Sequence, residues 1–347
     1  MNRTEIYLNE ISYKISFFTS AIITPIGIVC CFITSLVYFL NAKLKKTIGS
    51  YLLGCISSFS MISLLIEYLF IGFLPNFPGT NYVLENWSDA LCVLVQYVTR
   101  IFPQMASASQ AYLSVDRFIQ IKYPNKFKHS TRIWFMNLIL VLIFISLTIL
   151  NGITFVYRIQ FDLEEEEVEV EEMNSTSINE TMGHCEPSNG YMNMANDLIG
   201  ALLRLFLPFT IINVFNAKMI RFLVEHKRKI STFGYTSDQH QRKEKELAQT
   251  LITYDIIFLA HNLPLATLQI IHAIWDNSDL DFVHNQVSPV AARWRVAYRL
   301  SLFVAYLYNS MTFLVNMSFN KIFRQEILRI LRMMNESSTS GASRQHH

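Results

Sequence analysis

Seven long stretches of the 347-residue chain carry almost no charged side chains. Three of them, 15–40, 134–156 and 300–320, contain no Asp, Glu, Lys or Arg at all. A helix needs about 20 consecutive apolar residues to cross a bilayer, and only helices and closed barrels satisfy their backbone groups within lipid. Long apolar runs differ from the ten-residue alternating strands of barrels. The sequence therefore predicts an all-α membrane protein, a seven-transmembrane-helix bundle.

Composition supports this class, and the positions of the spans divide the chain into four parts. Hydrophobic residues make up 51% of the chain and charged residues only 16%, against about 25% in soluble domains, so neither a soluble enzyme nor a nucleic-acid-binding protein is expected. The predicted parts are an extracellular N-terminus (1–14), the seven-helix domain (15–320), a short amphipathic eighth helix (321–334) and a cytoplasmic tail (335–347). The predicted spans lie at about 15–40, 49–74, 87–121, 133–157, 192–225, 244–275 and 294–320.

The loop charges predict the orientation, because loops rich in Lys and Arg stay in the cytoplasm. The connections after the first, third and fifth spans are basic, whereas the segment 162–172 on the opposite side holds eight acids in eleven residues. A multi-pass plasma-membrane protein with its N-terminus outside and its C-terminus inside is therefore expected. The glycosylation sequons at Asn2, Asn174 and Asn179 all fall on the predicted outside, as acceptor sites must.

The five cysteines fall into two groups. Cys30, Cys31 and Cys55 lie within spans, where cysteine commonly acts as a small apolar packing residue. Cys92 and Cys185 are the only two on the predicted outside, where disulfides persist. A disulfide between them would attach the acidic loop to the head of the third span. No His or Cys spacing indicates a metal site, and no cofactor is predicted.

The third span carries a motif found in one receptor family. Arg117 lies 25 residues after Cys92 in the triplet Asp116-Arg117-Phe118, and Pro124 follows seven residues later. This pattern resembles the third helix of rhodopsin-like (class A) G-protein-coupled receptors, with its outer Cys, its D-R-Y triplet and its loop proline. The same pattern is similar to that of invertebrate peptide receptors of the FMRFamide type.

Further positions along the chain extend the resemblance to about residues 15–334. The segment 258–264, F-L-A-H-N-L-P, is similar to the F-x-x-C-W-x-P of the sixth helix. Glu244 stands twenty residues before Pro264, where the family often has an acid that pairs with the triplet Arg. The stretch after the seventh span resembles the amphipathic helix on the inner membrane face.

The resemblance implies a receptor that converts extracellular ligand binding into heterotrimeric G-protein activation, and we interpret the ligand as a neuropeptide. In the resting state Arg117 would pair with Asp116 and Glu244, which would hold the inner ends of the third and sixth helices together. Proline removes a backbone hydrogen bond within a helix, so the inner half of the sixth helix could swing. The residues of this hinge would be Phe258, Asn262 and Pro264.

Several family positions are changed. Cys31 replaces the Asn of the first helix and Ser58 the Asp of the second, while N-P-x-x-Y falls on 312–316 or, in another register, on 309–313, with no proline in either. The polar network and sodium site of the family are therefore expected to be absent. A receptor-shaped protein that binds a partner without signalling stays an alternative. A transporter should show interrupted, repeated halves, and an intramembrane enzyme a paired catalytic set; neither pattern is present.

Two arginines lie in the outer halves of spans, Arg100 in the third and Arg204 in the fifth. An Arg within a span is costly unless it faces a wet cavity or a partner, and its guanidinium binds carboxylates and carbonyls in bidentate fashion. Both are therefore predicted to bind a ligand that offers such a group. The alternative is that one of them pairs with Glu67 and the other reaches the interface. Neutral hydrogen bonds to the ligand are expected from Gln104, Asn262 and Gln269.

Overall fold

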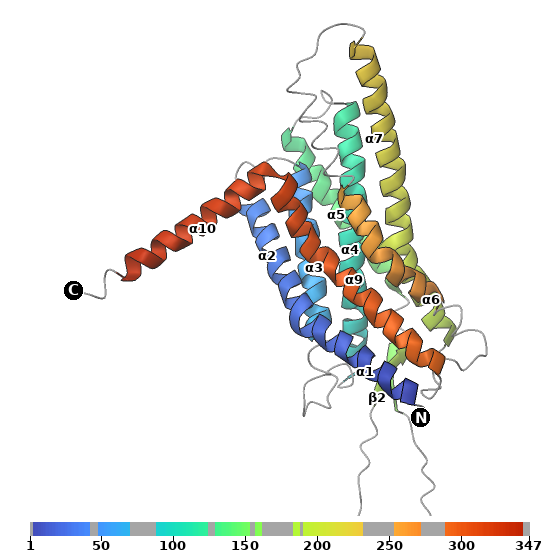
Figure 1. The fold of residues 1–347 in the computed structure, drawn as a ribbon. Helices are drawn as coiled ribbons and strands as arrows, with labels where there is room; N and C mark the ends of the chain where they lie inside the picture. Colours follow the sequence, from blue (N-terminus) through green and yellow to red (C-terminus); the bar gives the residue numbers. More distant parts are fainter. Residues whose placement is uncertain are drawn as a thin grey trace, which may run out of the picture.

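The computed structural model describes residues 3–41, 48–69, 88–123, 129–152, 157–161, 183–187, 190–231, 253–271 and 289–342. Long helices packed side by side make up most of it (Figure 1). The helices are α1 (Arg3–Phe18), α2 (Thr24–Leu40), α3 (Ile48–Glu67), α4 (Asp89–Lys122), α5 (His129–Leu150), α6 (Gly190–Ala201), α7 (Leu207–Ser231), α9 (Pro289–Phe319) and α10 (Lys321–Ala342). Between α7 and α9 lies the helix Thr253–Ile271, called the sixth helix below.

Two short π-helical segments join neighbouring helices without a break. The segment η1 (Thr19–Ile23) links α1 to α2, and η6 (Leu202–Phe206) links α6 to α7. The first and fifth transmembrane helices are therefore continuous from residue 3 to 40 and from 190 to 231. The architecture is the predicted seven-transmembrane-helix bundle with an amphipathic eighth helix, α10.

The first helix begins well before the apolar run that predicted it. Its polar start at 3–14 is helical and packs against α9. Lys14 pairs with Glu10 one turn earlier at 2.6 Å, and Arg295 of α9 donates to Asn9 Oδ1 at 3.0 Å. The first helix therefore packs along α9 over much of its length.

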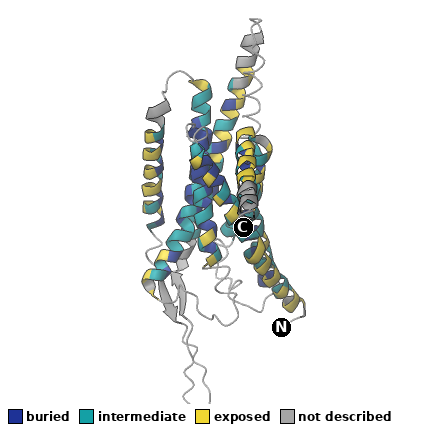
Figure 2. Cartoon of the chain, turned by 90° about the vertical axis from the view of Figure 1, so that its left-hand side faces the viewer, coloured by how far each residue is buried: buried dark blue, intermediate teal, exposed yellow. Residues whose placement is uncertain are grey.

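Of the seven transmembrane helices, six are long and apolar enough to cross a membrane by length and composition in their described residues. The helix α4 is the exception. Its 34 residues span about 51 Å at 1.5 Å per residue, so its length suffices. Polar side chains lower its hydropathy, among them the buried residues Gln104, Ser109 and Gln110. These side chains are compatible with the bilayer because α4 contacts α3, α5 and α7. The peripheral helix α5, by contrast, exposes Trp134 and Phe135, and Figure 2 shows the buried residues concentrated on the central helices.

A two-stranded antiparallel sheet, not predicted from the sequence, lies near the N-terminal end of the molecule (Figure 1). It pairs β1 (Tyr157–Phe161) with β2 (Gly183–Pro187), and Ile159 lies opposite Cys185. The strand β1 contacts α4. The end of the bundle that carries this sheet is called the hairpin end below, and the opposite end, where α10 begins, is called the α10 end. The acidic segment 162–172 lies outside the described residues.

The eighth helix extends further than predicted, to Ala342 rather than 334. It begins after Asn320, whose Oδ1 accepts a hydrogen bond from the backbone N–H of Phe323 at 3.1 Å, as an N-cap residue does. No proline follows, and the first glycine of the segment is Gly341. Phe323 and Ile327 are buried against the bundle, and Ile330 packs on the same cluster. The C-terminal part of α10 runs away from the bundle (Figure 1).

Candidate functional site

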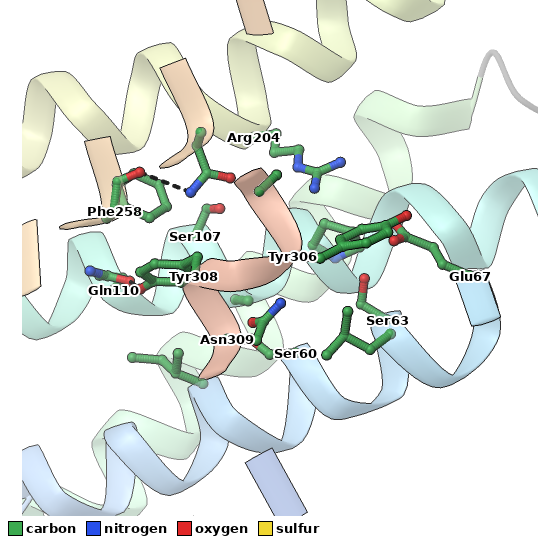
Figure 3. Close-up of a pocket in the computed structure, with 16 residues that line it drawn as sticks. Ser60, Ser63, Glu67, Ser107, Gln110, Arg204, Phe258, Tyr306, Tyr308 and Asn309 are labelled. Atoms are coloured by element: carbon green, nitrogen blue, oxygen red, sulfur yellow. Dashed lines mark hydrogen bonds between the residues drawn. The ribbon is translucent and has the colours of Figure 1, made fainter. Parts of the chain in front are cut away.

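A cavity lies within the bundle, bordered by α3, α4, η6, the sixth helix and α9. Figure 3 shows its lining side chains converging from these elements. The contributing residues of α3, Ser60, Ser63 and Glu67, recur at helical spacing and so share one face. The polar contributors from α4 and α9 are Ser107, Gln110, Tyr306, Tyr308 and Asn309.

Glu67 and Arg204 bring opposite charges to this cavity. Glu67 is 8% exposed, and its carboxylate accepts hydrogen bonds from the hydroxyls of Tyr306 and Ser63 while it lies in the field of the Arg204 guanidinium. Figure 3 shows the Arg204 and Glu67 side chains at the same end of the cavity, with the Tyr306 ring beside Glu67. Within the described part of the chain the two charged groups form no direct ion pair. The space beside them is open cavity.

Helix irregularities occur at the level of these charges. Arg204 lies within the π-helical segment η6, residues 68–69 directly after Glu67 are also π-helical, and η1 faces α9 from the first helix. A π-segment re-aims side chains relative to a regular helix and is frequent at functional sites. The carbonyl groups of η1 are partly satisfied by Thr24 Oγ1, which donates to the Thr19 carbonyl at 3.0 Å.

A second cavity adjoins the first, because Glu67 and Tyr306 line both. It lies between the first helix, α3 and α9. Its lining includes Arg299 of α9 and the hydroxyl-bearing residues Ser16, Thr19, Ser20 and Thr24 of the first helix. Sequence reasoning missed Arg299 because it lies near the predicted start of the seventh span, where a basic residue does not by itself indicate a function.

Two of the five predicted ligand-binding residues line the first cavity: Arg204 and Asn262. Arg100 instead donates to the Asn196 carbonyl at 3.2 Å and pairs with Asp197 at 3.4 Å, which joins α4 to α6. An Arg in a membrane needs a partner, and α6 supplies one. The role of Arg100 in ligand binding stays a prediction.

The other two predicted ligand contacts also lie elsewhere. Gln104 is buried and exchanges hydrogen bonds with Asn151, at 3.2 and 2.6 Å, which ties α4 to the end of α5. Gln269 is half-buried on the sixth helix and does not line the first cavity. Sequence spacing placed Gln104 and Arg100 correctly on one face of α4, but that face meets α5 and α6 rather than the cavity.

A layer of polar side chains crosses the bundle below the first cavity. Asp255 of the sixth helix accepts a hydrogen bond from Asn216 of α7 and another from Gln110 of α4. Gln110 accepts in turn from the Tyr308 hydroxyl of α9. Four helices thus meet in one chain of hydrogen bonds, called the polar layer below. A third cavity, lined by Asp255, Gln110 and Tyr308 among others, lies beside it. The only sequence signal for this layer was an acid within a span.

Arg117 lies further along α4, toward the α10 end. Its guanidinium packs against the backbone of α3 at Gly49, where a Cβ atom would lie 1.8 Å from Nη2. Its Nε is buried without a hydrogen-bond partner in the described structure. Asp116 accepts a hydrogen bond from Gln120, and its charge interacts with the Arg117 guanidinium. The predicted partner Glu244 lies outside the described residues.

Phe118, the third residue of the triplet, and Phe258, the first residue of the predicted hinge, pack against aromatic rings. Phe118 meets Phe215 of α7 with ring centroids 5.6 Å apart. Phe258 is buried and packs edge-on against Tyr308 at 5.7 Å, while Asn262 Nδ2 donates to the Phe258 carbonyl at 2.9 Å. Pro264 lies inside the sixth helix, which continues through it. The predicted hinge therefore lies directly above the polar layer.

The altered seventh-helix motif takes part in a different set of contacts at the α10 end. The Tyr38 hydroxyl of α2 donates to Asn316 Oδ1 at 2.5 Å and accepts from Asn320 Nδ2 at 3.4 Å. Asn316 Nδ2 donates to the Thr312 carbonyl at 3.0 Å, which also accepts from the Tyr254 hydroxyl at 3.2 Å. These contacts, called the Tyr38 cluster below, join the first, sixth and seventh helices to the start of α10.

The altered positions of the first and second helices are also internally satisfied. Ser58 and Ser35 share a hydrogen bond of 2.7 Å, and Ser58 donates to the Gly54 carbonyl at 3.0 Å. Cys31 is buried with a free thiol, like Cys55, and Cys30 is also free. Among the described residues, no group of three or more His, Cys, Asp or Glu side chains is placed to hold a metal ion.

Cys92 is fully buried and disulfide-bonded. It lies in the first turn of α4, where Ser88 Oγ caps the helix by accepting from the Leu91 N–H at 3.2 Å. The backbone of Cys185 lies in β2. The predicted glycosylation sites Asn2, Asn174 and Asn179 lie outside the described residues.

A seven-helix bundle with a cavity toward one end and a polar layer leading to the other defines a heptahelical membrane receptor. The family model described as 7 transmembrane receptor (rhodopsin family) matches residues 36–298, about three quarters of the chain. The protein belongs to this family and is a multi-pass receptor of the plasma membrane. No curated protein sequence matches the chain. The finer resemblance to FMRFamide-type receptors stays a prediction.

Proposed function

We propose that this receptor binds an extracellular neuropeptide in the cavity beside Glu67 and Arg204 and activates a heterotrimeric G protein at the α10 end. The N-terminus and the hairpin end then face the outside, and the disulfide partner of Cys92 is Cys185. The single observation that carries the proposal is the placement of the cavity, the polar layer and Arg117 in series on one helix, α4. Gln110, which lines the cavity, is two turns from Arg117.

The mechanism is a shift between two helix packings, biased by the ligand because it binds one packing more tightly. Contacts of the ligand with Arg204 and Asn262 act on the fifth and sixth helices. Movement of the sixth helix about Pro264 strains the hydrogen bonds of Asp255, and the inner half of the helix is displaced. Arg117 then leaves its resting place, and a cleft opens for the G protein.

The test is Arg117→Ala in cells that carry reporters for several G-protein classes and are challenged with a neuropeptide collection. The variant should lose G-protein activation while its surface expression and peptide binding stay close to wild type. Lys14→Ala is the matched control, because it removes a basic side chain at the hairpin end, exposed and paired only with Glu10. Signalling by Arg117→Ala at the wild-type level would contradict the assignment of Arg117.

A second candidate function is a receptor-shaped binding protein without G-protein signalling. Ser58, Cys31 and the seventh helix without its proline favour it, because these positions no longer form the network that the family uses. The same assay separates the two functions. Peptide binding without activation of any reporter, in wild type and variant alike, would support the alternative.

A further inference from the structure

The two adjoining cavities contain an odd number of charges. Glu67 borders both of them, Arg204 borders the first and Arg299 borders the second, while the other lining side chains are neutral. Two guanidinium groups and one carboxylate give the joined cavities a formal charge of +1. Glu67 can compensate only one of the two arginines.

Neither arginine is engaged with another part of the described structure. Among these residues, Arg204 and Arg299 form no ion pair, in contrast to Arg100, which meets Asp197 and the Asn196 carbonyl. Arginines within a membrane normally pair or face a water-filled space. Both side chains border cavities, so their unused hydrogen-bond donors are available to a bound molecule.

Glu67 is held by two hydroxyl groups and lies in the field of Arg204. The hydroxyls of Tyr306 and Ser63 fix its carboxylate, so it keeps its place when the charges beside it change. Tyr298 of α9 also lies in the fields of Arg204, Asp197, Arg299 and Glu67. Asp197 pairs with Arg100, so the surplus positive charge of the group is unchanged. Arg204 can turn to another anion while the hydroxyls of Tyr306 and Ser63 still hold Glu67.

We propose that the ligand presents a single negative charge, a carboxylate, which binds Arg204 in the first cavity, and that Glu67 determines this specificity. The inference rests on the proposed ligand-binding function and names the class of ligand. A carboxylate receives two parallel hydrogen bonds from a guanidinium, and one negative charge balances the surplus charge of the joined cavities. A cationic group would leave two arginines uncompensated, and a group with two negative charges would be repelled by Glu67.

Capture of defined peptides by the purified full-length receptor in lipid nanodiscs tests this class directly. The probes are pools of N-acetylated hexapeptides of identical sequences without Asp, Glu, Lys or Arg. Three of the pools differ only in the C-terminal group, which is a carboxylate, a carboxamide or an aminoethylamide. In a fourth pool the last residue is replaced by Asp with a free C-terminal carboxylate, so each peptide carries two negative charges. Captured peptides are quantified by mass spectrometry.

The wild type should retain the carboxylate pool at least tenfold better than the carboxamide and aminoethylamide pools. Arg204→Gln should abolish this preference, and Arg204→Lys should keep it with weaker capture because a bidentate contact is lost. Arg299→Gln should weaken carboxylate capture several-fold. Glu67→Gln should extend capture to the pool with two negative charges. Arg329→Gln, a change at an exposed residue of α10 paired with Glu326, should behave as wild type.

A wild-type preference for the carboxamide or the aminoethylamide pool would overturn the proposal, as would capture of none of the pools. An unchanged preference in Arg204→Gln, with thermal unfolding as in wild type, would do the same. Capture does not require a G protein, so a receptor that selects carboxylates without activating any reporter leaves this inference intact and contradicts only the proposed signalling function.

Discussion

The lining of the two adjoining cavities and the Tyr38 cluster use polar side chains in opposite ways. Toward the hairpin end, Glu67, Arg204 and Arg299 border open cavities and form no direct ion pairs among the described residues. Toward the α10 end, Tyr38 and Asn316 are bonded to each other at 2.5 Å and buried. The first region holds polar groups ready for a partner from outside the chain, whereas the second satisfies them within the chain.

The polar layer separates these regions and belongs to neither. Its hydrogen bonds from Asn216 and Gln110 to Asp255 are complete, as at the α10 end, but a cavity lies beside it, as at the hairpin end. A buried network of this kind is stabilising only while every member is satisfied. A movement that breaks one of its bonds therefore changes the energy of the whole layer, and this property suits an element between a binding site and an effector surface.

The largest effect is expected from removing the acceptor of the polar layer. Asp255→Leu should leave the amide donors of Asn216 and Gln110 unpaired within the bundle. Each unsatisfied buried group costs about 1–3 kcal/mol, so the free energy of unfolding should fall by about 2–5 kcal/mol. Denaturant titration in mixed micelles measures this loss.

Asp255→Asn is the matched control, because its side-chain oxygen keeps one acceptor at the same position. Its loss should be about half that of Asp255→Leu. An Asp255→Leu variant as stable as the wild type would show that the layer does not stabilise the bundle, and the contrast between its closed bonds and the open charges of the hairpin end would disappear.

The sequence predicted the bundle because long apolar runs permit few alternatives in a bilayer. Arg204 and Asn262, two of the predicted ligand-binding residues, line the first cavity, and their role in ligand binding stays a prediction. Periodicity shows which residues share a face of a helix, but it does not show which neighbour that face meets. Arg100 and Gln104 share a face as predicted, yet they are bonded to Asp197 and Asn151.

The α10 end shows a second limit of sequence reasoning. The missing proline of the seventh helix indicated a lost network. No sequence pattern indicated that Asn316 would bond to Tyr38, which lies 278 positions earlier. Contacts between residues so distant in the chain depend on how the helices pack. Asp255 was recognisable as an acid within a span, which normally has a partner, but its partners Asn216 and Gln110 lie on other helices.

A smaller effect is expected from the Tyr38 cluster. Tyr38→Phe keeps the ring that packs against Phe323 at 5.5 Å but removes the hydroxyl bonded to Asn316 and Asn320. The buried Asn316 oxygen is then left without its donor, and the unfolding free energy should fall by about 1–2 kcal/mol. Tyr13→Phe, at an exposed residue of the first helix, is the control and should change nothing. Equal stability of both variants would mean that the α10 end is held by ring packing alone.

The smallest change in stability, and the sharpest test of the α10 end, is expected at Gly49. An added Cβ would lie 1.8 Å from Arg117 Nη2 and 2.4 Å from its Cζ, so the flexible guanidinium must move away from α3. Alanine favours a helix over glycine by about 1 kcal/mol, which offsets part of this displacement, and the unfolding free energy should change by less than about 1 kcal/mol. Because Arg117 loses its resting place, ligand-independent G-protein signalling should rise above wild type at equal surface expression. Gly152→Ala is the matched control, since no atom lies within 4 Å of its added Cβ. If Gly49→Ala and Gly152→Ala signal alike, the packing of Arg117 on α3 is not part of the resting state.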